Sequence, residues 1–116
     1  MEYEREVEVR VIRKNSDGTK KVEPTKVKIT VYDIEEHDVA FSKAVKGRID
    51  PRNPQVDFDP TLYNRLRVVA AIVSPSELKS LEGVGRIHKN DFEQLLAQVD
   101  ELMGLNPLGN GVSSNQ

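Results

Sequence analysis

The sequence predicts an α+β fold, in which an N-terminal antiparallel β-hairpin precedes a small bundle of about four helices. Two observations predict it. Residues 4–32 alternate between apolar and charged side chains with the period of a half-buried strand, and residues 33–104 place apolar side chains at the 3.6-residue period of a helix. We expect residues 1–104 to form a single domain, and residues 105–116, which are rich in Gly, Asn and Ser, to form a flexible tail.

Two strands joined by a short turn are expected to form the hairpin. Their apolar face carries Val7, Val9, Val11, Val27, Ile29 and Val31. The sequence Asn-Ser-Asp-Gly at 15–18 supplies turn residues, and Gly18 can adopt a positive φ. Pro24 interrupts the second strand, which predicts an irregular or edge-like outer half. Because two strands alone are marginally stable, this face needs a layer of helices or a partner's strand against it.

The first two helices have recognisable start signals. Asp33 is the expected N-cap of the first, because a glutamate follows three residues later at the spacing of a capping box. Gly47 is the expected C′ residue that ends it. The segment 48–58 contains two prolines and mixed charges, which predicts a connector without a helix. Asp59 and Pro60 then supply an N-cap and a first-turn proline for the second helix.

Apolar stripes and caps place the remaining helices. The stripe of the second helix carries Leu62, Tyr63, Leu66, Val69, Ala70 and Val73. Ser74 and Glu77 match a capping box, which predicts a short helix through Leu81 that the glycines at 83 and 85 end. The last helix is expected to begin at Asn90 and to stop at Gly104. Its pattern is the most amphipathic, with an apolar side of Phe92, Leu95, Leu96, Val99, Leu102 and Met103.

Composition and charge exclude several classes of function. Charged residues make up 31% of the chain but the net charge is only −2, so the charges are mixed in sign and binding to a phosphate backbone is disfavoured. The absence of cysteine excludes disulfides, thiolate nucleophiles and cysteine-based zinc sites. No apolar run approaches the length of a membrane span, about 18 residues, and the charged N-terminus is unlike a signal peptide. We therefore expect a cytoplasmic protein without a membrane segment.

No stretch of the sequence carries a recognisable catalytic motif. We predict a protein that is not an enzyme and that holds no cofactor or metal. His37 has Asp33 and Phe41 one helical turn away on either side, but a metal site would need further converging ligands. His88 lies in a connector without a partner at a meaningful spacing. Both histidines are interpreted as surface or half-buried side chains without a chemical role.

The glycine turn at residues 81–85 resembles a known DNA-binding motif. Its sequence, Leu-Glu-Gly-Val-Gly, resembles the hairpin of helix-hairpin-helix DNA-binding modules, which implies that backbone amides contact a phosphate. In that family the second helix follows at once, whereas the helix signal here begins only at Asn90. Arg86 and Lys89 are the basic residues nearby, and acidic residues oppose them. We interpret the glycines as a chain reversal between packed helices and keep DNA binding as an alternative.

The order of the elements resembles the tail assembly chaperones of long-tailed bacteriophages and related viruses, over residues 20–104. The resemblance lies in an early extended segment, a mid-chain helix that ends at a Ser-Pro break (74–75), and a late helix that opens with Asn-Asp-Phe (90–92). It implies a non-catalytic protein of the host cytoplasm. Such a protein coats the long helical tape measure protein and helps to recruit tail tube subunits.

Apolar helix faces are the expected means of holding a partner, through anchors at i, i+3, i+4 and i+7. The expected contacts lie mainly on the last helix, with support from the second: Phe92, Leu95, Val99, Leu102 and Met103, with Leu62, Leu66 and Val69. The expected partner is a tape measure or tail tube protein, and the chain is also a candidate homo-oligomer. An alternative is a structural virion or adaptor protein that adds its hairpin strands to a neighbour's sheet.

Overall fold

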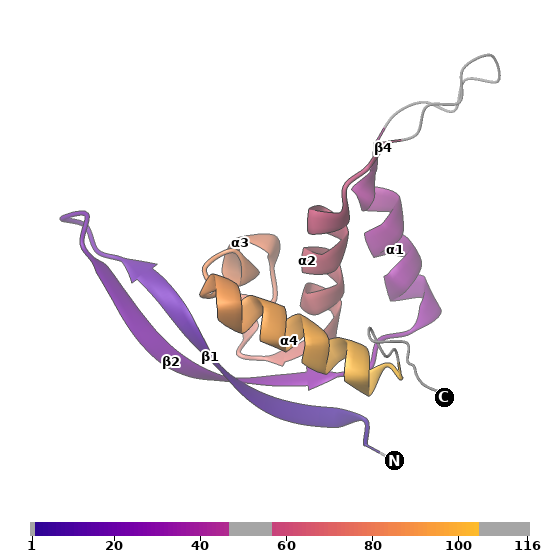
Figure 1. Ribbon diagram of the computed structural model, residues 1–116, viewed down its shortest axis with the longest axis horizontal. Helices are drawn as coiled ribbons and strands as arrows, with labels where there is room; N and C mark the ends of the chain where they lie inside the picture. Colours follow the sequence, from indigo (N-terminus) through magenta and orange to yellow (C-terminus); the bar gives the residue numbers. More distant parts are fainter. Residues whose placement is uncertain (1, 47–56, 105–116) are drawn as a thin grey trace.

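The computed structural model describes residues 2–46 and 57–104, and it confirms the α+β class with an N-terminal hairpin followed by helices (Figure 1). Gly47, most of the expected connector and the expected tail lie outside the described residues. The elements are β1 (Glu4–Lys14), β2 (Lys20–Thr30), α1 (Ile34–Ala44), β3 (Val45–Lys46), β4 (Asp57–Phe58), α2 (Pro60–Ala71), β5 (Ile72–Ser74), the 3₁₀ helix η1 (Ser76–Leu78), α3 (Leu81–Val84) and α4 (Lys89–Leu102). Within these ranges the strands form two sheets, β1-β2-β5 and β3-β4.

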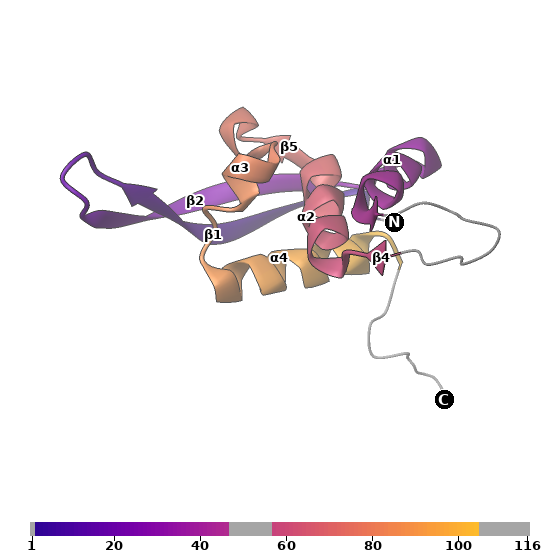
Figure 2. The same ribbon diagram turned by 90° about the horizontal axis from the view of Figure 1, so that it is seen from above.

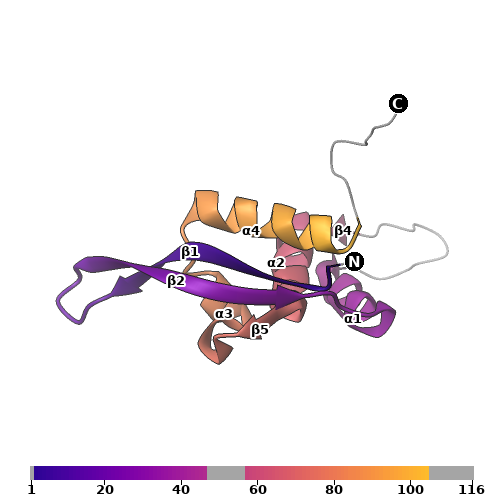
Figure 3. The ribbon, with the colours of Figure 1, turned by 90° about the horizontal axis from the view of Figure 1, so that it is seen from below.

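The hairpin is a long antiparallel pair whose apolar face is turned toward the helices. β1 and β2 pair from Glu4 opposite Thr30 to Lys14 opposite Lys20, and Gly18 adopts a φ of 89° in the turn, as predicted. Four side chains of the predicted apolar face are at most 1% exposed: Val9, Val11, Val27 and Ile29. Seen from above, the helices overlie or flank the hairpin (Figure 2), and seen from below the hairpin runs between α4 on one side and α3 and β5 on the other (Figure 3).

β2 continues through Pro24 without interruption, so the predicted irregularity is wrong. Arg10 lies opposite Pro24 and directs its backbone away from β2. Its N–H donates to the Asp91 side chain (2.7 Å), and its C=O accepts from the N–H of His88 (2.8 Å). Arg10 and Pro24 therefore form a non-hydrogen-bonded pair, and the N–H that proline lacks would point outward. The outer part of β2 is an edge there, as predicted, because β5 pairs nearer its C-terminal end.

A third strand, β5, joins the sheet where the sequence predicts the end of a helix and a capping box. α2 ends at Ala71, and the next residues pair with β2. Ile72 is 1% exposed, because the extended backbone places it against the hairpin. Ser74 lies in this strand and does not cap η1, so the predicted capping box is wrong. Ser80 instead caps α3, since its hydroxyl accepts from the N–H of Gly83 (2.9 Å).

Local signals place the other helix boundaries. The carboxylates of Asp33 and Asp59 each accept from the N–H three residues later, at 2.9 Å and 3.0 Å, which confirms both N-caps. Gly104 follows α4 with a φ of 78°, which confirms the predicted stop. α4 begins at Lys89 with His88 as its N-cap, slightly earlier than predicted. The short β3-β4 pair has no counterpart in the prediction.

The core lies between the hairpin and helices α2, α3 and α4. Beyond the hairpin residues it contains Val68, Ala71, Ile72, Leu78, Val84, Ile87, Leu95 and Val99. Arg67, which is 7% exposed, joins α2 to α4 because its Nη1 donates to Asp100 (2.6 Å) and to the Tyr32 hydroxyl (3.3 Å). α1 packs on α2 at the outer side of this bundle (Figure 1). This position leaves much of α1 at the surface.

Candidate partner-binding surface

α1 buries two small residues and exposes its large apolar ones. Ala40 and Ala44, which face α2, are 4% and 0% exposed. Val39 is 54% exposed on one flank of the helix, and Ile34 and Phe41 are 71% and 46% exposed on the other. Single exposed apolar residues are ordinary in folded proteins. Three of them on one short helix mark α1 as the first candidate for contact with another molecule.

A groove of about 330 Å³ lies between α1 and α2 on the Val39 flank. Its apolar lining comes from both helices: Val39, Ala40, Leu66, Val69 and Ala70. Glu35, Glu36 and Lys43 also line it and are exposed. An apolar groove with charged residues along its border is the geometry that accepts the apolar face of an amphipathic helix.

The opposite flank of α1 carries an aromatic cluster formed by His37, Phe41, Phe58 and Tyr63. The ring centroids of Phe41 and Phe58 lie 5.4 Å apart, and those of Phe58 and Tyr63 lie 5.3 Å apart. His37 Nε2 is 2.8 Å from the Tyr63 hydroxyl oxygen, and the Arg67 guanidinium lies 5.1 Å from the centre of the Tyr63 ring. The rings therefore hold one another in place, while Phe41 and Phe58 remain 46% and 42% exposed.

The two flanks lie on opposite sides of α1, and we refer to them together as the α1–α2 surface: Ile34, Val39, Phe41, Phe58, Leu66 and Val69. On the aromatic side it continues into a hollow of about 310 Å³, whose lining includes Tyr32 and Met103. Met103 directly follows α4, so the surface also touches the end of the helix that the sequence singles out. The predicted contacts include no residue of α1 itself. The sequence does contain a signal for α1: large apolar residues stand on both sides of the helix face that Ala40 and Ala44 form.

The predicted partner contacts divide into core and surface residues. Leu95 and Val99 are 0% exposed and belong to the core that the helices share with the hairpin, so in this structure they are not at the surface. Three other predicted residues of the last helix pack half-buried against this core: Phe92, Leu102 and Met103. Leu62 is half-buried on α2. Leu66 and Val69 line the groove beside α1, where a partner could reach them.

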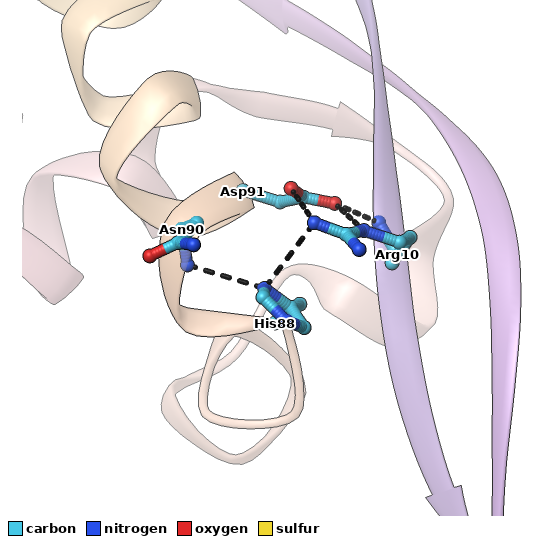
Figure 4. A network of polar contacts seen from close by, with 4 residues as sticks. All are labelled: Arg10, His88, Asn90 and Asp91. Atoms are coloured by element: carbon cyan, nitrogen blue, oxygen red, sulfur yellow. Dashed lines mark hydrogen bonds and ion pairs between the residues drawn. The ribbon is translucent and has the colours of Figure 1, made fainter.

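His88 and Asp91 form a polar network with Arg10 at the start of α4 (Figure 4). Asp91 Oδ2 accepts from the backbone N–H (2.7 Å) and Nε (2.8 Å) of Arg10, and Oδ1 accepts from Nη2 (2.8 Å). His88 Nδ1 accepts from the N–H of Asn90 (3.2 Å) and lies 3.5 Å from Arg10 Nη2. The contacts of Arg10 fasten the helix to β1, and the contact between His88 and Asn90 caps the helix, so the network has a structural role.

The glycine turn of α3 does not present free amides to a phosphate. The N–H of Gly83 donates to Ser80, and those of Val84 and Gly85 donate to the carbonyls of Ser80 and Leu81. The next two N–H groups of the chain also donate to carbonyls within the turn. In addition, a Cβ at residue 83 would lie 2.4 Å from a backbone oxygen. The glycines therefore permit close packing, and the resemblance to a helix-hairpin-helix module finds no support in this geometry.

Metal binding and membrane insertion are two other classes of function to consider for the described residues. In the parts of the chain that the structure describes, no group of three or more His, Cys, Asp or Glu side chains is placed to hold a metal ion. None of the helices over residues 2–46 and 57–104 combines the length and apolarity needed to cross a bilayer. The chemistry that the α1–α2 surface offers to a ligand is apolar contact.

Comparison with known proteins adds no relative to this description. No family model, curated protein or solved structure matches the chain. The geometry of the α1–α2 surface is therefore the basis on which a function is proposed.

Proposed function

We propose that this protein is a non-catalytic binding protein that holds an amphipathic helix of another polypeptide on its α1–α2 surface. The single observation that carries the proposal is the exposure of Ile34, Val39 and Phe41 on both flanks of one helix. Tail assembly chaperones, which the order of elements resembles, act in this way on a tape measure protein. We accordingly propose a chaperone for such a helical partner, with recruitment of tail subunits as its further consequence.

The surface suits this role because its exposed groups stand on a rigid support. Ala40 and Ala44 fix α1 on α2, and the ring contacts of Tyr63 fix the aromatic flank. A partner helix therefore meets a preformed groove and adds apolar burial without reordering the fold. Each exposed apolar side chain that becomes covered contributes about 1–3 kcal/mol at most.

The hairpin alternative is less well supported. The outer part of β2 is one edge that a neighbour's strand could reach, and there Pro24 removes one of the N–H groups directed outward. Lysines at positions 20, 21 and 26 flank this proline, and edge lysines oppose strand addition. These features are those by which proteins protect an edge from pairing.

The proposal predicts that a charge on the α1–α2 surface abolishes binding and leaves folding unchanged. Val39→Glu and Ile34→Glu place the charge at positions that are 54% and 71% exposed, so the free energy of unfolding should change by less than about 0.5 kcal/mol. Affinity should fall about tenfold or more, because the complex would bury an unpaired carboxylate. The measurement is the soluble yield of a tape-measure-type protein, a long helical polypeptide that aggregates alone, on co-expression with each variant.

Val73→Glu is the matched control, since Val73 is also apolar and 43% exposed but lies on β5, away from the α1–α2 surface. It should keep the partner soluble as well as the unchanged protein does. If all three variants rescue the partner equally, the α1–α2 surface is not the binding site.

A further inference from the structure

A second recess, far from α1, lies beside the outer part of the hairpin. It has a volume of about 530 Å³, and four basic side chains line it: Arg13, Lys14, Lys20 and Arg86. Ile12 and Ile87 line it as well, and none of the described residues in its lining is acidic. We call it the basic hollow. In a chain of net charge −2, such a local excess of cations needs its own explanation.

The backbone makes the basic hollow a fixed feature. The residues after α3 run along the free side of β1: the N–H of Ile12 donates to the carbonyl of Arg86 (2.8 Å), and Val11 forms a bridge with Ile87. On the other side, Lys14 pairs with Lys20 at the end of the β1-β2 ladder. The walls are thus joined by main-chain hydrogen bonds, and beyond α3 the hairpin continues on its own (Figure 1).

Lysines 14 and 20 carry charge that the protein leaves uncompensated. They lie directly opposite each other in the ladder, an arrangement of like charges that destabilises a hairpin. Neither has a carboxylate partner among residues 2–46 and 57–104. An anion bound between the two ammonium groups would remove this repulsion. The electrostatic energy that destabilises the free protein would therefore favour binding of the anion.

The two arginines are held in place and retain donors for a ligand. Arg13 contacts Glu23 through Nε (3.2 Å) and Glu77 through Nη2 (2.7 Å), and Arg86 contacts Glu82 through Nη2. A guanidinium has five N–H donors, and within the described part of the chain the Nη1 group of each arginine is not used by these pairs. The carboxylates therefore orient the arginines, although they also reduce the net charge at the border of the hollow.

We propose that the basic hollow binds a short acidic segment of a protein partner, whose carboxylates contact Lys14 and Lys20, with Arg13 and Arg86 at the border of the hollow. A short segment fits because Glu23, Glu77 and Glu82 limit the positive region on its borders. A nucleic acid backbone would continue past the hollow and meet these carboxylates. This site is separate from the α1–α2 surface, and either proposal can fail without the other.

The test is fluorescence anisotropy of a fluorescein-labelled hexaglutamate peptide titrated with the full chain at low ionic strength. Lys14→Gln/Lys20→Gln should weaken binding about tenfold, since two exposed ion pairs are lost. Lys26→Gln/Arg65→Gln removes the same net charge at exposed positions outside the hollow and outside the groove beside α1, and it should change affinity less than about twofold. Thermal unfolding of both double variants provides a check on folding, and loss of the Lys14–Lys20 repulsion should leave the first no less stable than the unchanged protein.

Three results would overturn the proposal. They are no peptide binding by the unchanged protein at low salt, an equal loss of affinity in the two double variants, and tighter binding of a single-stranded DNA of the same charge than of the peptide. The last result would assign the hollow to nucleic acid instead.

Discussion

Asp91 is the residue on which the attachment of α4 to the sheet depends most directly. Its carboxylate accepts from the side chain and from the backbone N–H of Arg10, and these hydrogen bonds hold the pKa of Asp91 well below its ordinary value. It also lies in the first turn of α4, where a negative charge interacts favourably with the helix dipole. The Asp91 side chain is 13% exposed and that of Arg10 is 49% exposed, so salt screens part of this attraction.

We predict that this contact makes stability depend on pH on the acid side. Because folding lowers the pKa of Asp91, its contribution is fully present above the unfolded value of about 3.9 and is lost as the pH falls toward the folded value. Asp91→Asn should therefore lower the melting temperature at neutral pH, and the difference from the unchanged protein should shrink below about pH 4. Glu93→Gln, in the same helix turn, is the control and should show no such convergence. Melting curves by circular dichroism at several pH values measure it.

At the scale of elements, local signals could be predicted and non-local pairing could not. The caps at Asp33 and Asp59 and the stop at Gly104 depend on chemistry within a few residues, so the sequence contains all of it. β5 depends on pairing with a strand more than forty residues earlier, and its Ser-Pro-Ser-Glu context imitates a helix start. The same limit applies to the candidate site. Helical periodicity identifies the apolar stripe of α4, but only the fold shows that Leu95 and Val99 are covered by the hairpin.

The short helix α3 yields a prediction that depends on one close approach. A Cβ at Gly83 would lie 2.4 Å from the Glu77 carbonyl oxygen and 2.7 Å from Leu78 Cα, which are backbone atoms that cannot move independently. Gly83→Ala should therefore lower the free energy of unfolding by about 1–3 kcal/mol. Gly85→Ala is the control, since its nearest atom would be 3.1 Å away and its φ is −66°. Urea unfolding curves would contradict the packing argument if the two variants were equally stable.

At the scale of the whole molecule, the hairpin and the helices share one core. Val9, Val11, Val27 and Ile29 from the hairpin form a single cluster with residues of α2, α3 and α4. The helices therefore cannot bury their apolar faces alone, and the hairpin has no second hydrophobic layer of its own. The hairpin and the helices of the described residues follow one another in the sequence, but they do not fold independently.

A chain that lacks residues 1–31 should fail to fold cooperatively. Removal of the hairpin would expose Leu95, Val99 and Val68, each 0% exposed in the full chain, at a cost of about 1.5–3 kcal/mol per side chain. A chain that ends at residue 104 retains every described element and is the matched control. Circular dichroism during heating should show a sharp transition for the control and a gradual change for the other. A sharp transition in both would contradict a shared core.

The proline in the outer half of β2 has a consequence for the protein at high concentration. Lys20, Val22 and Lys26 direct their N–H groups outward from the same edge, and position 24 leaves a gap among them. Copies that paired edge to edge would lack one main-chain hydrogen bond in the middle of every contact. Continued growth into a filament is therefore unfavourable. The protein can thus keep a long two-stranded arm in solution at high concentration without seeding amyloid.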